Sequence, residues 1–425
     1  MSAAYVGLCK YDEGLKIASE AYDEMEGAHS TVRAEVTLNL AIAHYRKGEY
    51  AGASRLLDLI PETEDIVYVR ALQYHGNIAR AYGDFARALT KYHEAFAHLD
   101  RCRYHDRFTE AILLFSLANL CAELPRLDLW PEVSKRIEEF DWSVSGVATW
   151  RYYIAIASSF ITELLGDLQQ STEWACLAEE IASDSESLIV AWCRLAASLG
   201  RYGEKRAHSY LTNKAIRKYD AIPRDSRLRE HTTLSLDIAE EILHSDFPVR
   251  ASRLVSYYAE VVAPARSIGV QGRKMESRYA TVLGLLEERG GNKARAEEAY
   301  RRAFEISRSA GLMRTGSIVA YRLFVLTGDE RYEAFIKSAL ADVSEKYWVK
   351  ARLAKSRIEA RLTKKQLEVV RLVAAGKSNK EIAVARGISL SRAKNTVAEI
   401  FAIVGVQSRA ELATLATARG LIRSN

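Results

Sequence analysis

Residues 362–390 read LTKKQLEVVRLVAAGKSNKEIAVARGISL. Two short amphipathic helical patterns lie on either side of Gly376, and a third begins after Gly387. The turn at Gly387 needs a residue that tolerates a positive φ angle, and Ser389 supplies an N-cap for a helix running to about Val404. Short helices joined by tight glycine turns are the components of a helix-turn-helix.

The end of the chain continues this pattern and carries the positive charge. A fourth helical pattern starts at Ser408, whose spacing to Glu411 predicts a capping box, and ends at Gly420. Residues 361–425 hold 12 Lys or Arg and four Asp or Glu, whereas residues 1–360 hold 48 and 51. All the excess positive charge therefore lies in the terminus, as neutralisation of DNA phosphates requires. The alternative, a generic helical cap on a helical protein, does not require this concentration of positive charge.

The terminal block resembles the DNA-binding domain of the LuxR/FixJ family of bacterial transcription regulators. The matching residues are 362–363, 376–383 and 405–412. The resemblance implies a LuxR-type helix-turn-helix domain over residues 362–425 that binds double-stranded DNA. Regulators of this type commonly pair through the fourth helix, which implies a homodimer. Its predicted interface residues are Leu412, Leu415 and Ala416.

The helix after Gly387 is the predicted DNA-reading element, because the second helix of such a motif lies in the major groove. Asn395 is the residue type that pairs bidentately with adenine, and Arg392 and Lys394 suit guanine edges or phosphates. Lys380 lies where a helix start can meet phosphates. The predicted DNA-binding residues are Lys380, Ser391, Arg392, Lys394, Asn395 and Thr396. The alternative for each basic residue is a solvated surface charge.

Several positions depart from the family pattern. Residues 392–396 are Arg-Ala-Lys-Asn-Thr, where the family usually has Thr-Val-Lys-x-His, and Gln366 and Ile403 replace a usual Glu and a frequent Lys. The apolar positions that would fold the domain are retained. The departures leave the DNA sequence preference open. They also slightly favour an alternative function, that of an interaction scaffold whose helix-turn-helix has lost DNA binding.

The remaining residues have the composition of an all-α protein. Only six prolines occur, all before position 265, and Ala, Leu, Arg and Glu are abundant. No window approaches 18 apolar residues without charge, and no signal peptide pattern is present. The five cysteines are scattered, without Cys-x-x-Cys spacing. These features predict a cytoplasmic protein with neither a membrane segment nor disulfides.

A turn with a glycine followed by an aromatic residue recurs through residues 1–343. The clearest instances are 48–53 and 83–88; weaker or degenerate ones are 9–14, 126–128, 166–168, 200–202, 245–247, 291–296 and 328–330. Each follows one amphipathic helix and opens another. The pattern resembles tetratricopeptide (TPR) repeats, which implies a TPR-like superhelix of about eight or nine helix pairs. An irregular helical bundle is the alternative.

A TPR superhelix exposes its first helices along a concave groove, and this predicts an effector site. The predicted groove residues are Arg70, Gln73, Asn77, Arg80, Tyr153 and Arg194. Arginine and asparagine side chains suit a peptide backbone, a carboxylate or a phosphate. Ordinary solvated residues are the alternative. Residues 344–361 are basic and contain neither Gly nor Pro, which predicts a helical linker.

No pattern in the chain indicates catalysis. Gly376-Lys377-Ser378 looks like the end of a phosphate-binding loop, but Arg371 occupies the position of its required glycine. The nine histidines show no metal-ligand spacing, and no nucleophile–base set stands out. We therefore expect no enzyme activity, cofactor or metal. The sequence predicts a DNA-binding transcriptional regulator whose repeats bind an effector (a small molecule, a peptide or a protein), mediate dimerisation, or both.

Overall fold

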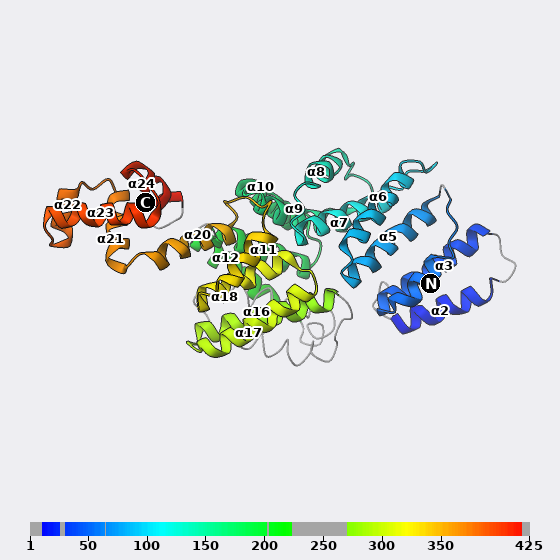
Figure 1. Cartoon of the computed structure of the whole chain (residues 1–425). Helices are drawn as coiled ribbons and strands as arrows, with labels where there is room; N and C mark the ends of the chain where they lie inside the picture. The colour runs from blue at the N-terminus through cyan, green and yellow to red at the C-terminus, as the bar shows by residue number, and fades with distance from the viewer. Residues whose placement is uncertain (1–10, 26–29, 64, 202–203, 223–269, 419–425) are drawn as a thin grey trace.

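The computed structural model describes residues 11–25, 30–63, 65–201, 204–222 and 270–418. Within these ranges the regular elements are helices, with no strand, which confirms the all-α fold class. Figure 1 shows an elongated molecule with the N-terminal helices at one end and the C-terminal helices at the other. No helix in the described part is long and apolar enough to cross a membrane.

Most helices before residue 340 pack as hairpins of neighbours in sequence. In the described ranges they form α2 and seven pairs. Their bounds are α2 (Tyr11–Asp23), α3 (Ser30–Lys47), α4 (Tyr50–Leu57), α5 (Ile66–Tyr82), α6 (Phe85–Leu99), α7 (Arg107–Glu123), α8 (Trp130–Glu139), α9 (Ala148–Leu164), α10 (Leu168–Ile181), α11 (Ser185–Arg201), α12 (Lys205–Asp220), α16 (Val270–Arg289), α17 (Lys293–Ser309), α18 (Met313–Thr327) and α19 (Glu330–Ala339). The predicted turn at 245–247 lies outside the described residues.

The predicted glycine turns separate the helices of these pairs. Five of the turn glycines have φ between 73° and 84°: Gly48, Gly83, Gly166, Gly291 and Gly328. A glycine in the left-handed conformation ends one helix. In the turn at Gly83 the next residue, Asp84, caps the following helix, because its side chain accepts from the backbone N–H of Arg87 at 3.0 Å. The recurrent turn therefore joins a helix stop to a helix start.

The two helices of a pair approach closely where glycine faces an aromatic ring. A Cβ atom added to Gly76 would lie 2.5 Å from Cε1 of Tyr92, and one added to Gly284 would lie 2.4 Å from Cε1 of Tyr300. Both tyrosines are fully buried. The same packing thus recurs in two repeats that are far apart in the chain, as TPR-like repeats require.

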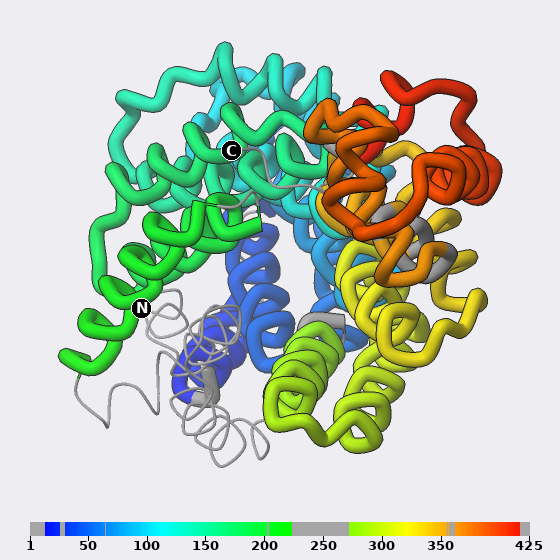
Figure 2. The backbone as a smooth tube through the Cα atoms, turned by 90° about the vertical axis from the view of Figure 1, so that its left-hand side faces the viewer, coloured from blue at the N-terminus to red at the C-terminus, as the bar shows by residue number. Residues whose placement is uncertain are grey.

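The superhelix brings distant repeats into contact. Helices α16 and α18 touch α5 and α7, and Figure 2 shows the repeats arranged around a common axis. Glu123 Oε2 at the end of α7 lies 2.5 Å from Lys274 Nζ in α16. The Phe85 ring packs against Gly311, where an added Cβ would lie 2.9 Å away. We call these contacts between α5–α7 and α16–α18 the closing contacts.

The predicted linker is partly a packed element of the repeats. Helix α20 spans Trp348–Arg361, and Tyr347, Trp348 and Val349 are buried in the same apolar core as the repeats. Just before it, the Ser344 N–H donates to the Leu164 carbonyl at 3.1 Å. The prediction of a basic tether over all of 344–361 is therefore corrected for its first residues. These residues pack on the repeats because their apolar side chains are removed from water there.

The C-terminal helices enclose a second core. They are α21 (Lys364–Ala374), α22 (Asn379–Arg386), α23 (Leu390–Val404) and α24 (Arg409–Ala418). The buried residues between them include Val369, Ile382 and Ile400, and this cluster is separate from the repeat core. The predicted end of the fourth helix at Gly420 lies outside the described residues.

Candidate functional sites

Two reciprocal caps define the start of the helix-turn-helix. Thr363 Oγ1 accepts from the Gln366 N–H at 3.2 Å, and Gln366 Oε1 accepts from the Thr363 N–H at 2.9 Å. Gln366 therefore performs the capping that a Glu performs at this position. At α22, Ser378 and Glu381 form the same box, and the backbone hydrogen bond from Ser378 lowers the pKa of Glu381 to about 2.

The turn before α23 has the predicted geometry. Gly387 has φ 62°, and Ser389 Oγ accepts from the Arg392 N–H at 3.2 Å. Helix α23 ends at Val404, as predicted. The fourth helix differs in detail: Ser408 Oγ accepts from the Glu411 N–H at 3.1 Å, but the Glu411 carboxylate accepts from Gln407 N–H at 2.8 Å. The second hydrogen bond of the predicted capping box is therefore made by the N–H of Gln407 instead of the N–H of Ser408.

The predicted DNA-binding side chains lie on the outer faces of α22 and α23. Lys380, Ser391, Arg392, Lys394 and Asn395 are exposed. Thr396 is half-buried, and its Oγ1 donates to the Arg392 carbonyl at 2.9 Å. Among the described residues no carboxylate pairs with Lys380, Arg392 or Lys394, so these three charges are available to phosphates.

Two of the departures from the family pattern, at Ala393 and Ile403, have structural explanations. Ala393 is completely buried between the helices, so a small apolar residue there belongs to the core and removes no DNA contact. Ile403 packs against the same core. The exposed face of α23 therefore depends on Arg392, Lys394 and Asn395 for its chemistry.

Arg409 connects the fourth helix to the turn before α22. Its Nη1 donates to Asn379 Oδ1 at 2.7 Å, and its Nη2 donates to the Lys377 carbonyl. This positioning role was missed at the sequence level, where Arg409 is only one residue of the matching block 405–412. Nothing in the local sequence shows that the side chain reaches back about 30 residues to the start of α22.

The predicted dimer residues do not form one exposed surface. Leu412 and Ala416 are completely buried in the core of their own domain, whereas Leu415 is half-buried. The assignment of Leu412 and Ala416 to an interface is corrected: helical spacing groups them correctly, but the face they occupy packs against α21. Any pairing through α24 would use Leu415 and its exposed neighbours.

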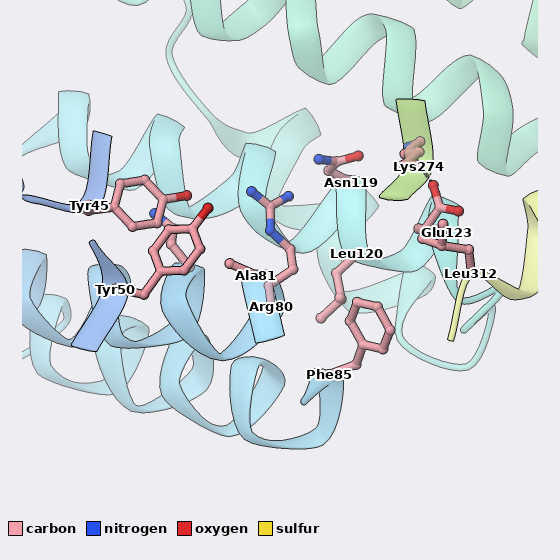
Figure 3. Close-up of a pocket in the computed structure, with 11 residues that line it drawn as sticks. Tyr45, Tyr50, Arg80, Ala81, Phe85, Asn119, Leu120, Glu123, Lys274 and Leu312 are labelled. Atoms are coloured by element: carbon pink, nitrogen blue, oxygen red, sulfur yellow. Dashed lines mark hydrogen bonds and ion pairs between the residues drawn. The ribbon is translucent and has the colours of Figure 1, made fainter. Parts of the chain in front are cut away.

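The repeats contain a cavity of about 120 Å³ beside the closing contacts (Figure 3). Its lining comes from α3, α4, α5, α6, α7, α16 and the residue that precedes α18. The lining residues are Tyr45, Tyr50, Asn77, Arg80, Ala81, Phe85, Asn119, Leu120, Glu123, Lys274 and Leu312. Of the six predicted groove residues, the cavity includes Asn77 and Arg80.

The other predicted groove residues are placed differently. Gln73 is 4% exposed, and Asn77 is buried with its Oδ1 accepting from Tyr92 Oη at 2.8 Å. Tyr153 is exposed but belongs to an aromatic cluster with Phe115, at 5.5 Å between ring centroids. Arg70 is half-buried on α5 and outside the cavity. The prediction that these residues line a single exposed groove is therefore wrong, because neighbouring repeats cover part of the predicted face.

Arg194 belongs to a buried ion network rather than a groove surface. Its Nη2 lies 2.7 Å from Glu163 Oε2, and its guanidinium stacks 4.0 Å from the Phe160 ring centroid. Arg201 Nη1 lies 3.0 Å from Glu163 Oε1. Burial alone would raise the pKa of Glu163, but the charges of Arg201 and Arg194 lower it to about 2. The network holds α9 against α11.

Comparison with known families agrees with the geometry of the C-terminal helices. The family described as "Bacterial regulatory proteins, luxR family" matches residues 360–416. The C-terminal domain is thus a LuxR-type helix-turn-helix domain, the DNA-binding domain of a class of bacterial regulatory proteins. The chain joins this regulator domain to a TPR-like helical domain.

No curated protein matches the chain significantly. Two solved structures are similar to it at low identity. The crystal structure of yeast Tom70 has 12% identity and a TM-score of 0.29, covering 80% of this chain and 88% of that one. The APC/C hetero-tetramer Cut9–Hcn1 has 14% identity and a TM-score of 0.35, covering 98% of this chain and 88% of that one.

Proposed function

We propose that this chain is a sequence-specific, DNA-binding transcriptional regulator whose repeat domain controls DNA binding in response to an effector. The observation that carries the proposal is the outer face of α23, where Arg392, Lys394 and Asn395 are exposed on a LuxR-type domain. In a helix-turn-helix this face enters the major groove. The separate core of residues 362–416 supports a DNA-binding unit of its own.

Helices α22 and α23 would make different kinds of contact with DNA. Lys380, in the first turn of α22, offers a cation and backbone N–H groups at the positive end of a helix, which suits a phosphate. On α23, Asn395 suits an adenine edge, and Lys394 and Arg392 suit a guanine edge or a phosphate. Specificity would therefore come from α23, and α22 would set the position of the domain on the backbone.

Genomic footprinting with the full-length protein tests this proposal and supplies a target sequence. On that target, Asn395→Ala and Lys394→Ala should each weaken specific binding by about 5-fold to 150-fold, because a good base contact contributes about 1–3 kcal/mol. Lys365→Ala, which removes an exposed cation from α21, is the matched control. It should change the affinity much less.

The salt dependence separates phosphate contacts from base contacts. Lys380→Ala should weaken binding to all DNA sequences and lower the slope of log affinity against log salt by about one. Absence of binding to any genomic fragment at low salt would favour the scaffold alternative.

We also propose that the protein binds as a homodimer on inverted half-sites about one helical turn apart. The exposed neighbours of Leu415 on α24 would supply the contact. Sedimentation of the protein–DNA complex should give two chains per duplex. One chain per duplex, with a footprint over a single half-site, would overturn the dimer.

A further inference from the structure

The cavity beside the closing contacts has polar groups that converge on one point. In Figure 3 the hydroxyls of Tyr45 and Tyr50, the guanidinium of Arg80 and the amide of Asn119 face the same space. They come from four different helices, α3, α4, α5 and α7. Convergent polar groups in a concave, partly apolar site are the usual features of a small-molecule site.

The charges around this cavity do not balance. Among the described residues Glu123 is the one carboxylate that lines it, and it is already paired with Lys274 at 2.5 Å and Arg314 at 3.7 Å. Thr315 Oγ1 also donates to Glu123 Oε1 at 3.0 Å. Arg80 has a hydrogen bond to Tyr45 but no ion pair with any carboxylate in the described residues. Lys274 and Arg314 thus already share this carboxylate, whereas Arg80 pairs with none, and a half-buried cation of this kind attracts an anion strongly.

Apart from Asn77, whose Oδ1 accepts from Tyr92, the rest of the lining is apolar. Phe85, Leu120 and Leu312 face the cavity, together with the rings of the two tyrosines. The volume of about 120 Å³ is somewhat smaller than the ~150 Å³ cavity that accepts benzene in another protein. An inorganic oxyanion would leave this apolar wall uncovered, whereas an acid with a small apolar body would cover it.

We infer that this cavity binds a small organic carboxylate, with its carboxylate on Arg80 and Asn119 and its apolar body against Phe85 and Leu312. The tyrosine hydroxyls supply further donors to the carboxylate. A guanidinium–carboxylate contact is among the strongest hydrogen-bonded pairs in proteins. The inference deepens the proposed function and rests on it in one respect: such an acid would be the effector.

The position of the cavity gives the ligand a way to act. Its walls belong to α5 and α7 on one side and to α16 on the other, so an occupied cavity favours the closed arrangement of the repeats. Helix α18, beside α16, contacts α20 through the Tyr321 and Trp348 rings, whose centroids lie 6.0 Å apart. Helix α20 leads directly into the DNA-binding domain.

Calorimetric titration of the full-length protein without DNA tests the site. The probes are butyrate and isobutyrate as acids, whose apolar bodies are smaller than benzene, isobutyramide as the neutral analogue of isobutyrate, and inorganic phosphate. At least one acid should bind in the micromolar to millimolar range, and isobutyramide should bind at least about tenfold more weakly, because it lacks the charge that Arg80 meets. Phosphate should not bind measurably.

Paired variants locate the binding. Arg80→Gln should weaken acid binding by about 10-fold to 100-fold, since it removes a charged hydrogen-bond donor. Arg70→Gln removes the same charge from the same helix outside the cavity, and it should bind the acid like the parent. Asn119→Leu is a second variant, which keeps the size of the side chain and removes its donor. It should weaken binding as well, and it keeps the test decisive if Arg80→Gln does not fold.

Three results would overturn the inference. The first is that no acid binds at concentrations up to about 10 millimolar, and the second is that phosphate binds while no acid does. The third is that both Arg80→Gln and Asn119→Leu bind the acid like the parent. DNA affinity measured without any acid is a separate readout. A protein that binds DNA but no acid would sink only this inference, and a protein that binds the acid but no DNA would sink only the proposed regulator function.

Discussion

Gly76 and Gly284 occupy equivalent positions in two repeats, each against a completely buried tyrosine ring. The Tyr300 ring cannot move away easily, because its Oη donates to Glu288 Oε2 at 2.6 Å. Gly284→Ala places a Cβ 2.4 Å from this ring and should lower the free energy of unfolding by about 1–3 kcal/mol. Denaturant unfolding measures the loss.

Gly290→Ala, directly after the last residue of α16, is the matched control. Its added Cβ would meet the nearest atoms at 3.5 Å, an ordinary contact, and the loss of chain entropy in the unfolded state favours alanine. This variant should unfold at the parent's denaturant concentration or slightly above it. Equal losses in the two variants would contradict the close approach of α16 and α17.

Glu163 is the residue on which the buried ion network depends. Glu163 and Arg194 have side chains that are 2% exposed, so Glu163→Gln leaves Arg194 charged and buried without its counter-ion. The expected loss of unfolding free energy is about 3–5 kcal/mol. Glu297→Gln, which breaks an ion pair within the exposed face of α17, should cost much less.

The same carboxylate predicts a pH dependence. Burial opposes its ionisation, but Arg201 and Arg194 lower the pKa of Glu163 to about 2 from an ordinary 4.5. A lowered folded-state pKa contributes stability that is fully present above about 4.5 and is lost as the pH falls toward 2. The parent should therefore lose more stability across this window than Glu163→Gln, as thermal unfolding at each pH would show. Parallel pH profiles would contradict the assignment.

At the scale of single elements, the start of α22 is held in place by a side chain of α24. Arg409 of α24 fixes the turn before α22 through Asn379 and the Lys377 carbonyl. Arg409→Met should destabilise the C-terminal domain by about 1.5–3 kcal/mol and weaken binding to every DNA sequence alike. Thermal unfolding and DNA titration of the full-length protein measure the two effects.

Arg371→Met is the control for this element, because Arg371 is exposed on α21. It removes the same charge without removing the contact to the turn. Arg409→Met differs from a phosphate-contact variant in one respect: the domain's melting temperature should fall, whereas Lys380→Ala should leave it unchanged. A stable Arg409→Met domain with reduced DNA affinity would assign Arg409 to the DNA instead.

For the whole molecule, the closing contacts hold the shape of the superhelix. Glu123 faces Lys274 and Arg314, and these charges lower its pKa to about 2 in spite of its burial. Glu123→Gln removes the shared counter-ion and leaves two cations facing each other, so α7 should separate from α16 and α18. Small-angle scattering should then give a larger radius of gyration.

The control for this shape change is Glu276→Gln. Glu276 also lies on α16, but it pairs with Arg302 of α17 inside one hairpin, at 2.8 Å. Its loss should leave the scattering curve unchanged. An unchanged curve for Glu123→Gln as well would mean that apolar packing, including that of Phe85 on Gly311, is sufficient to keep the repeats closed.

The sequence alone determined what depends on short-range interactions. The turns at Gly83 and Gly387, the caps at Ser378 and Ser389 and the exposed Lys394 were all predictable, because each rests on groups within about four residues of one another. Helix hairpins and a helix-turn-helix are built from such local rules, so their types and many of their boundaries can be inferred from one chain.

Only the tertiary structure decided which face of each helix is left open. The resemblance to TPR repeats placed Gln73 and Arg194 on one groove, and the resemblance to LuxR regulators placed Leu412 on a dimer surface, but neighbouring helices bury all three. The cavity is likewise absent from any local pattern, since Glu123 and Lys274 are separated by 151 residues. Burial and ion pairing at that range depend on the summed curvature of many repeats, and no short stretch of sequence contains it.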